Sequence, residues 1–254
     1  MAEDARPSSM SPPPAVLLPA PPAIHSVASE ARLRLWQLLS PALPVGAFSY
    51  SEGLELLVQS GLITDSASLG CWLEAELERG LLTLEAASLR ELMVDLARAR
   101  SDSGAMAAVR ERDGWLLAQR EAAEMRAQQR QMGGSLCQLL ADLGWPLPDR
   151  PGGAPPLAWT AAWAWAGVCL DLEPEAVVEA YLHSWTANQI SAALRLVPLG
   201  PTEAQRLQLS LVPCVARRAA ALSAADPEQL WCGGVGAGVA QLGHAGLYSR
   251  LFRS

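Results

Sequence analysis

The sequence predicts an all-α protein, a single-domain bundle of roughly eight to ten helices. Ala and Leu recur throughout, whereas the 254 residues include only three Ile and five Thr, a mixture that favours helix over sheet. Apolar residues also recur at helical spacings, and no stretch alternates apolar and polar residues as a strand does. Half of the residues are hydrophobic, which is enough to bury a sizeable core.

Composition divides the chain into a leader, a helical body and a tail. Residues 1–28 contain seven prolines, and acidic residues lie where a signal peptide carries positive charge, so we expect a disordered Pro-rich leader. Residues 29–231 are the predicted helical domain. Residues 232–254 are a Gly-rich tail with aromatic and apolar residues that a solvated tail does not need, and we expect a partner to order it.

Pro, Gly and capping residues separate the predicted helices. The expected spans are 30–39, ended by Pro41; 66 to about 100, capped by Asp65 or Ser66 and interrupted at Gly70 and Gly80; 114–143, interrupted at Gly133 and Gly134; 157–170; 173–197; and a last main helix that starts at Pro201 and kinks at Pro213. The Trp-rich stretch 157–170 would span only about 21 Å as a helix, too short for a bilayer, so we expect a buried core helix.

The stretch SPALPVGAFSYSEGLE, residues 40–55, is too apolar for an ordinary loop. Ser49 and Glu52 have the spacing of a capping box, which predicts a helix from about residue 50 to residue 61. The connector before that helix has two interpretations. It is either a buried loop or a rigid apolar loop that is presented to another protein.

Two polar patterns also stand out. Ser184, Asn188, Ser191 and Arg195 lie at spacings of four, three and four, so they share one face of an otherwise apolar helix, as a satisfied internal network or as an interface. In REAAEMRAQQRQMGG, residues 120–134, Arg120 and Glu124 can pair four residues apart, which is typical of a solvated charged face.

Charge and motif content disfavour several classes of function. A net charge of −7 argues against nucleic acid or an anionic membrane as the main partner. All 19 basic residues are Arg, so the sequence lacks the usual Schiff-base residue and the phosphate-loop lysine, which disfavours two large classes of enzyme. The five cysteines form no CxxC pair and the three histidines are far apart, so we expect no metal site and no catalytic set. These features favour a binding module over an enzyme.

Four segments of the chain occur in the same order in the UreF family of urease accessory proteins, which the sequence resembles over about residues 32–254. They are SPALPVGAFSYSEGLE, REAAEMRAQQRQMG, NQISAALRLVPLG and YSRLFRS. The sequence departs from the family pattern at Pro201, where Gln is usual, and at Ala245, where Glu is usual. The Gly-rich run 232–243 also replaces a stretch that we expect to be less flexible.

The resemblance implies an all-helical, non-catalytic, cytoplasmic protein without a cofactor or a metal site of its own. Members of this family dimerise, bind an accessory protein called UreD or UreH, and recruit the GTPase UreG to apo-urease. The resemblance therefore implies a role in regulating GTP-dependent nickel delivery to urease. Two other functions stay open, an all-α enzyme acting on an anionic small molecule and a direct nickel chaperone that uses His183, His244 and the cysteines.

The same resemblance implies that the first segment, the charged segment, the polar stripe and the tail face partners. The candidate partner-binding residues are Pro44, Gly46, Phe48, Ser49, Tyr50, Ser51, Glu52, Gly53, Arg120, Glu124, Arg126, Asn188, Arg195, Tyr248, Arg250, Leu251 and Phe252. We further expect the tail to dock on the loop at residues 41–50, with Arg250 stacking on or hydrogen bonding near Tyr50.

Overall fold

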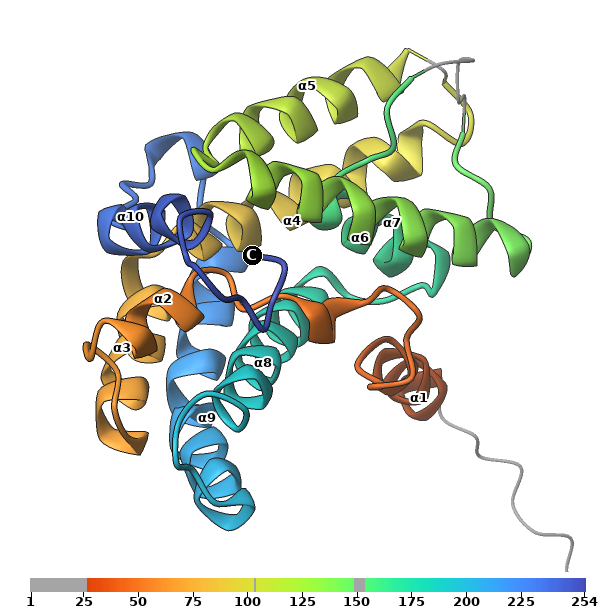
Figure 1. The fold of residues 1–254 in the computed structure, drawn as a ribbon. Helices are drawn as coiled ribbons and strands as arrows, with labels where there is room; N and C mark the ends of the chain where they lie inside the picture. Colours follow the sequence, from red (N-terminus) through yellow and green to blue (C-terminus); the bar gives the residue numbers. More distant parts are fainter. Residues whose placement is uncertain (1–26, 103, 149–153) are drawn as a thin grey trace, which may run out of the picture.

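A computed structural model describes residues 27–102, 104–148 and 154–254, and within these residues the protein is all-α with no strand (Figure 1). Most of the predicted leader therefore lies outside the described residues. The helices of the described chain are α1 (Val27–Leu38), α2 (Leu54–Gln59), α3 (Ser66–Arg79), α4 (Leu82–Arg98), α5 (Ala105–Ala118), α6 (Ala123–Asp142), α7 (Trp159–Cys169), α8 (Pro174–Ala193), α9 (Pro201–Ser223) and α10 (Val235–His244), with 3-10 turns η1 (Ala47–Ser49) and η2 (Pro227–Gln229).

The Trp-rich helix α7 lies in the core, as predicted. It packs between α4 and α6, and α4 also contacts α3, α5, α8 and α9, so these two helices organise the bundle. Trp163 and Trp165 are almost completely buried, and the indole nitrogen of Trp163 donates to the carbonyl of Val177 at 3.2 Å. Burying a large aromatic ring contributes on the order of 2 to 3 kcal/mol, provided that its N–H finds an acceptor.

Several predicted helix boundaries are confirmed. Asp65 caps α3, since its carboxylate accepts from the amide of Ser68 at 2.8 Å. The chain breaks at Gly80 between α3 and α4, but α3 continues without interruption through Gly70. Pro201 takes the first turn of α9, where its missing N–H costs nothing, and α9 continues through Pro213.

The predicted interruption at Gly133 is wrong, because α6 runs through it. A Cβ on Gly133 would lie 2.2 Å from the carbonyl oxygen of Leu157 and 2.5 Å from the carbonyl carbon of Ala158. The glycine therefore lets the chain that enters α7 cross α6 at backbone contact, and its role is close packing instead of helix termination.

The predicted capping box at Ser49 and Glu52 is also wrong. Gly46 adopts φ 74° and starts the 3-10 turn η1, Glu52 adopts φ 53°, and helix α2 begins after Gly53, whose φ is 88°. A Cβ on Gly53 would lie 2.9 Å from the backbone of Ala240 and Gln241. Gly53 thus serves both a left-handed turn and the close approach of α10 to α2.

The Gly-rich tail forms a helix. Residues 235–244 are α10, which packs against α2, and Ala245 is its exposed C-cap (Figure 1). The chain then turns back toward the body, where the hydroxyl of Ser254 donates to the side-chain oxygen of Gln128 on α6. In the part of the chain that the structure describes, none of the helices has both the length and the apolar character that a bilayer span requires.

Candidate functional site

Two segments that are far apart in the sequence meet at one place, which we call the tail junction: residues 48–55 and residues 248–254. The main-chain oxygen of Ser254 accepts from the amides of Ser51 at 2.7 Å and Glu52 at 3.0 Å, and from the hydroxyl of Ser51 at 2.8 Å. The amide of Arg253 donates to the carbonyl of Ser49 at 2.9 Å. The amides of Ser51 and Glu52 thus share one acceptor, so the tail docks beside the predicted loop.

Phe252 is the apolar anchor of the junction. Its side chain is only 4 % exposed, and the guanidinium of Arg195 lies 4.4 Å from the centre of its ring. Arg195 also donates to the carbonyl of Phe48 at 3.4 Å. The polar stripe of α8 thus continues to Arg195, two residues after the end of the helix, and this exposed cation lies over the buried ring of Phe252.

Glu55 of α2 binds the backbone of the tail through its carboxylate. Its carboxylate accepts from the amides of Leu251 at 2.7 Å and Phe252 at 3.0 Å, and its Oε2 lies 3.1 Å from Nε2 of the buried His244. Burial alone would raise the pKa of Glu55, but the two amides and His244 outweigh it, so the pKa lies below its usual range. The ionised carboxylate is therefore the form that binds the tail.

Glu124 at the start of α6 completes the contact. Arg250 donates to its Oε1 at 2.7 Å, and its Oε2 lies 3.5 Å from Nδ1 of His244. The expected Arg250–Tyr50 contact is wrong, because Arg250 pairs with Glu124 and Tyr50 is buried. The expected Arg120–Glu124 pair is also wrong, because Arg120 lies in the connector before α6 and pairs with Glu85 in the core.

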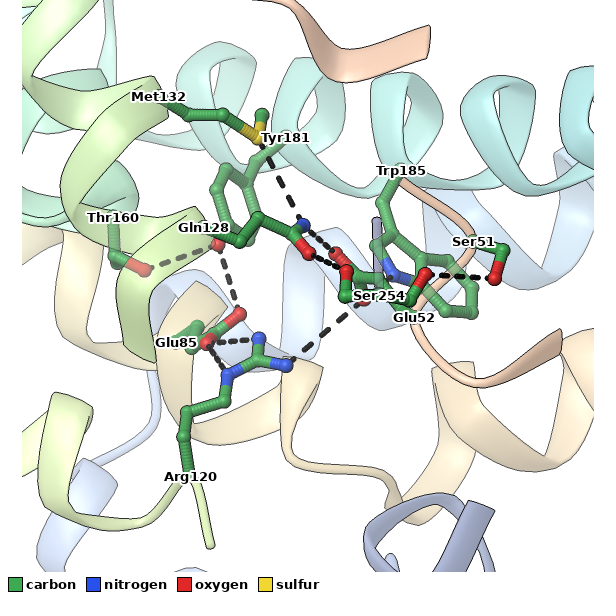
Figure 2. A network of polar contacts seen from close by, with 10 residues as sticks. All are labelled: Ser51, Glu52, Glu85, Arg120, Gln128, Met132, Thr160, Tyr181, Trp185 and Ser254. Atoms are coloured by element: carbon green, nitrogen blue, oxygen red, sulfur yellow. Dashed lines mark hydrogen bonds and ion pairs between the residues drawn. The ribbon is translucent and has the colours of Figure 1, made fainter. Parts of the chain in front are cut away.

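Arg120 is the centre of a buried polar network (Figure 2). Its guanidinium forms an ion pair with Glu85 of α4, and Glu85 also accepts from the hydroxyl of Tyr181 at 2.9 Å, which lies 3.0 Å from the hydroxyl of Thr160. Burial raises the pKa of Tyr181, and Glu85 adds to that rise. Burial lowers the pKa of Arg120, but the charges of Glu85 and Glu52 raise it by more, so the guanidinium stays charged.

The network extends from Arg120 to the tail. Glu52 lies 3.9 Å from Arg120 and accepts from the indole of Trp185 at 3.1 Å and from the amide of Gln128 at 2.9 Å. Gln128 in turn accepts from the hydroxyl of Ser254 (Figure 2). The core ion pair and the tail junction are therefore one connected hydrogen-bond system.

Apolar side chains remain exposed around the junction. Phe48 is 73 % exposed, Leu251 is about half exposed, and Tyr248 is fully exposed; Pro44 is also exposed. Asn188 does not join the polar network; it lines an apolar groove of about 250 Å³ between α1, the 39–48 segment and α8, together with Ser184 and Ser191. These positions suit contact with another protein.

The site contains one further candidate residue, Arg126, and three residues that the sequence analysis does not identify. Arg126, one of the candidates, donates to the carbonyls of Arg120 and Glu121 and so fixes the connector before α6. The candidate residues do not include Glu55, Glu85 and Gln128. Glu55 and Glu85 are charged residues within apolar runs, which is a signal that could have identified them, whereas Gln128 lies in a polar stretch and gives no such signal. Within residues 27–102, 104–148 and 154–254 no group of three or more His, Cys, Asp or Glu side chains is arranged to hold a metal ion.

Comparison with known proteins decides the family. A family model described as UreF matches residues 63–212, which is more than half of the chain. The chain belongs to the UreF family. Its similarity to curated proteins extends beyond this region: it is 41 % identical to the urease accessory protein UreF of Trichormus variabilis over 225 residues, which are 87 % of this chain and 95 % of that protein.

Other UreF relatives match to a similar extent. The UreF protein of Microcystis aeruginosa is 42 % identical over 222 residues, or 87 % of this chain and 97 % of that protein. That of Synechocystis sp. is 38 % identical over 239 residues, or 90 % of this chain and all of that protein. The match of the UreF model runs from the residues before α3 into α9, so it covers the helices that form the core of the bundle.

Proposed function

We propose that this chain is a urease accessory protein that acts in urease maturation. Family membership is the observation that carries the proposal, because the relatives named urease accessory protein UreF match the chain over nearly their whole length. We further propose that the chain acts in the cytoplasm as a non-catalytic assembly factor.

We further propose the partners that the resemblance implies. The protein forms a homodimer, binds a UreD- or UreH-type protein, and recruits the UreG-type GTPase to apo-urease, where it regulates GTP-dependent nickel delivery. The tail junction supports one part of this proposal. Phe48, Tyr248 and Leu251 are exposed apolar side chains of the junction, where backbone hydrogen bonds join the two segments. Apolar anchors on a backbone that is already fixed lose little conformational entropy when a partner docks.

The test is a complementation and co-purification experiment in urease-positive cells that lack their own copy of this gene. The full chain should restore urease activity and co-purify with a tagged UreD-type protein, and with the UreG-type GTPase when nucleotide is present. The proposal is refuted when the folded chain neither restores activity nor joins a complex under any nucleotide condition.

A matched pair of variants tests the role of the surface. Phe48→Ser should reduce complex formation at least about tenfold, the loss that one apolar anchor of 1.4 kcal/mol or more gives. Leu209→Ser removes a similarly exposed apolar side chain from α9, far along the sequence from the junction, and should leave the complex unchanged. Equal losses in both variants would contradict the assignment of the surface.

A further inference from the structure

A cavity of about 240 Å³ lies beneath α10, beside the network of Arg120 but not filled by it. Its walls come from α3, the α5–α6 connector, α8 and α10. Two tryptophans, Trp72 and Trp185, and three carboxylates, Glu52, Glu76 and Glu121, line it. Exposed residues of α10 line it as well, so solvent can reach it.

The charges that line the cavity do not balance. Arg120 is the cation among the lining residues, and its guanidinium is already paired with Glu85. Glu52 accepts from Trp185 and Gln128, so its oxygens are also satisfied. Glu76 and Glu121 remain as lining carboxylates that form no ion pair with any described residue.

Glu76 is the least compensated of these groups. Among the described residues, no hydrogen bond or ion pair reaches its carboxylate, and a Cβ on Gly80 would lie 2.3 Å from its Oε2, so the glycine provides the space that the carboxylate occupies. Burial raises the pKa of Glu76 to about 7, and the charge of Glu52 adds to this effect, while Arg120 and Arg79 oppose it. Glu121 and the thiol of Cys232 also line the cavity.

A second, independent group is also without a partner. Gln189 lines the cavity and is only 1 % exposed. Its side-chain Nε2 forms no hydrogen bond with any described residue. Leaving a buried amide unpaired costs about 1 to 3 kcal/mol, so native proteins usually place a ligand or a water there. Because amide oxygen and nitrogen exchange places by a 180° rotation, Gln189 can offer an acceptor to a cation.

We propose that this cavity binds an organic cation of the guanidinium or primary ammonium class, supplied by a free small molecule or by an arginine or lysine side chain of a partner. The carboxylates of Glu76 and Glu121 neutralise its charge, and the side-chain oxygen of Gln189 accepts a hydrogen bond from one of its N–H groups. The rings of Trp72 and Trp185 provide faces for cation–π contact. This inference does not depend on the proposed function.

The test follows the carboxyl carbon of Glu76 by NMR in the full chain labelled at glutamate, with Glu76→Gln assigning the signal. Methylguanidinium chloride should bind with a Kd on the order of 1 mM, as expected for so small a ligand, and neutral methylurea should not bind. Glu76→Gln should weaken methylguanidinium binding, followed on the Glu121 signal, at least tenfold. Glu74→Gln removes an exposed charge from the same helix and should have no effect.

Two peptides separate the sources of the cation. An acetylated pentapeptide with arginine between glycines tests the partner side chain, and the same peptide with citrulline is its neutral control. Binding of methylguanidinium and the arginine peptide supports a partner side chain; binding of methylguanidinium alone supports a small molecule. Equal binding of methylurea, or equal affinity in Glu76→Gln, overturns the proposal.

A measurement on the unmodified chain keeps the test valid when Glu76→Gln does not fold. Because the cation and the proton compete for Glu76, saturating methylguanidinium should lower the titration midpoint of Glu76 by about one pH unit or more. Sodium chloride at the same ionic strength should leave the midpoint in place. An unchanged midpoint in methylguanidinium overturns the proposal.

Discussion

Replacing Arg120 by methionine isolates the energetic role of the buried network. The side chains of Arg120 and Glu85 are 5 % and 3 % exposed, so the substitution leaves a carboxylate in the core with only the hydroxyl of Tyr181 as a donor. Methionine fills much of the volume of the arginine stem, and therefore the change reports mainly on charge and hydrogen bonding.

The expected loss is about 3 to 5 kcal/mol at pH 8, the cost of removing one partner of a buried ion pair. The loss should be smaller at pH 5, where the isolated carboxylate is neutralised by a proton. Combining Arg120→Met with Glu85→Gln removes both charges and keeps an acceptor for Tyr181, so the double variant should be more stable than Arg120→Met alone.

Urea unfolding followed by circular dichroism at both pH values measures these differences, with slopes compared to confirm the same transition. Arg112→Met is the matched control, because it breaks an ion pair with Glu91 whose carboxylate is 45 % exposed, and it should cost less than about 1 kcal/mol. The reasoning is refuted when Arg120→Met costs no more than the control, or when the double variant is less stable than Arg120→Met.

Three further predictions concern the tail and the cavity. Gly53→Ala should destabilise the protein by at least about 1 to 2 kcal/mol in urea unfolding, because φ is 88° and α10 lies against its Cβ position; Gly61→Ala, with φ 75° and open space, should lose only the backbone part. Glu55→Gln should speed amide exchange of Leu251 and Phe252 at pH 7, and since the pKa of Glu55 is lowered on folding, the unmodified chain should lose that protection only as pH falls below about 4.5. The pKa of Glu76 shifts in the opposite direction, from 4.5 to about 7 on folding, so the free energy of unfolding should fall by up to about 3 kcal/mol as the pH rises from 4.5 to 7. Glu76→Gln should abolish that fall. Amide exchange that is unchanged in Glu55→Gln, or a flat pH profile in the unmodified chain, would contradict these assignments.

Patterns that depend on local chemistry were predictable from the sequence. The all-round apolar stretch at residues 157–170 could only be buried, Asp65 precedes a run with helical periodicity, and Pro201 fits a first helical turn. Each of these depends on interactions within a few residues, which the sequence displays directly.

Contacts between distant segments were not predictable in the same way. Ser49 and Glu52 match a capping box, yet the amide of Glu52 donates to Ser254 and its carboxylate accepts from Trp185. The spacing of Arg120 and Glu124 predicts a solvated helical surface, but helix α6 begins after Arg120, and Arg120 pairs with Glu85, 35 residues earlier. The docking of the tail on the first loop was anticipated, whereas its actual partners were not.

The tail junction also sets an order of events during synthesis on the ribosome. Ser51 and Ser254 are 203 residues apart, which at about 5 to 20 residues per second separates their appearance by roughly 10 to 40 s. For that interval the amides of Ser51 and Glu52, and the carboxylate of Glu55, have only water as a partner. The loop that receives the tail therefore lacks these partners while the rest of the bundle forms, and it gains them only in a nascent chain that has been translated as far as Ser254.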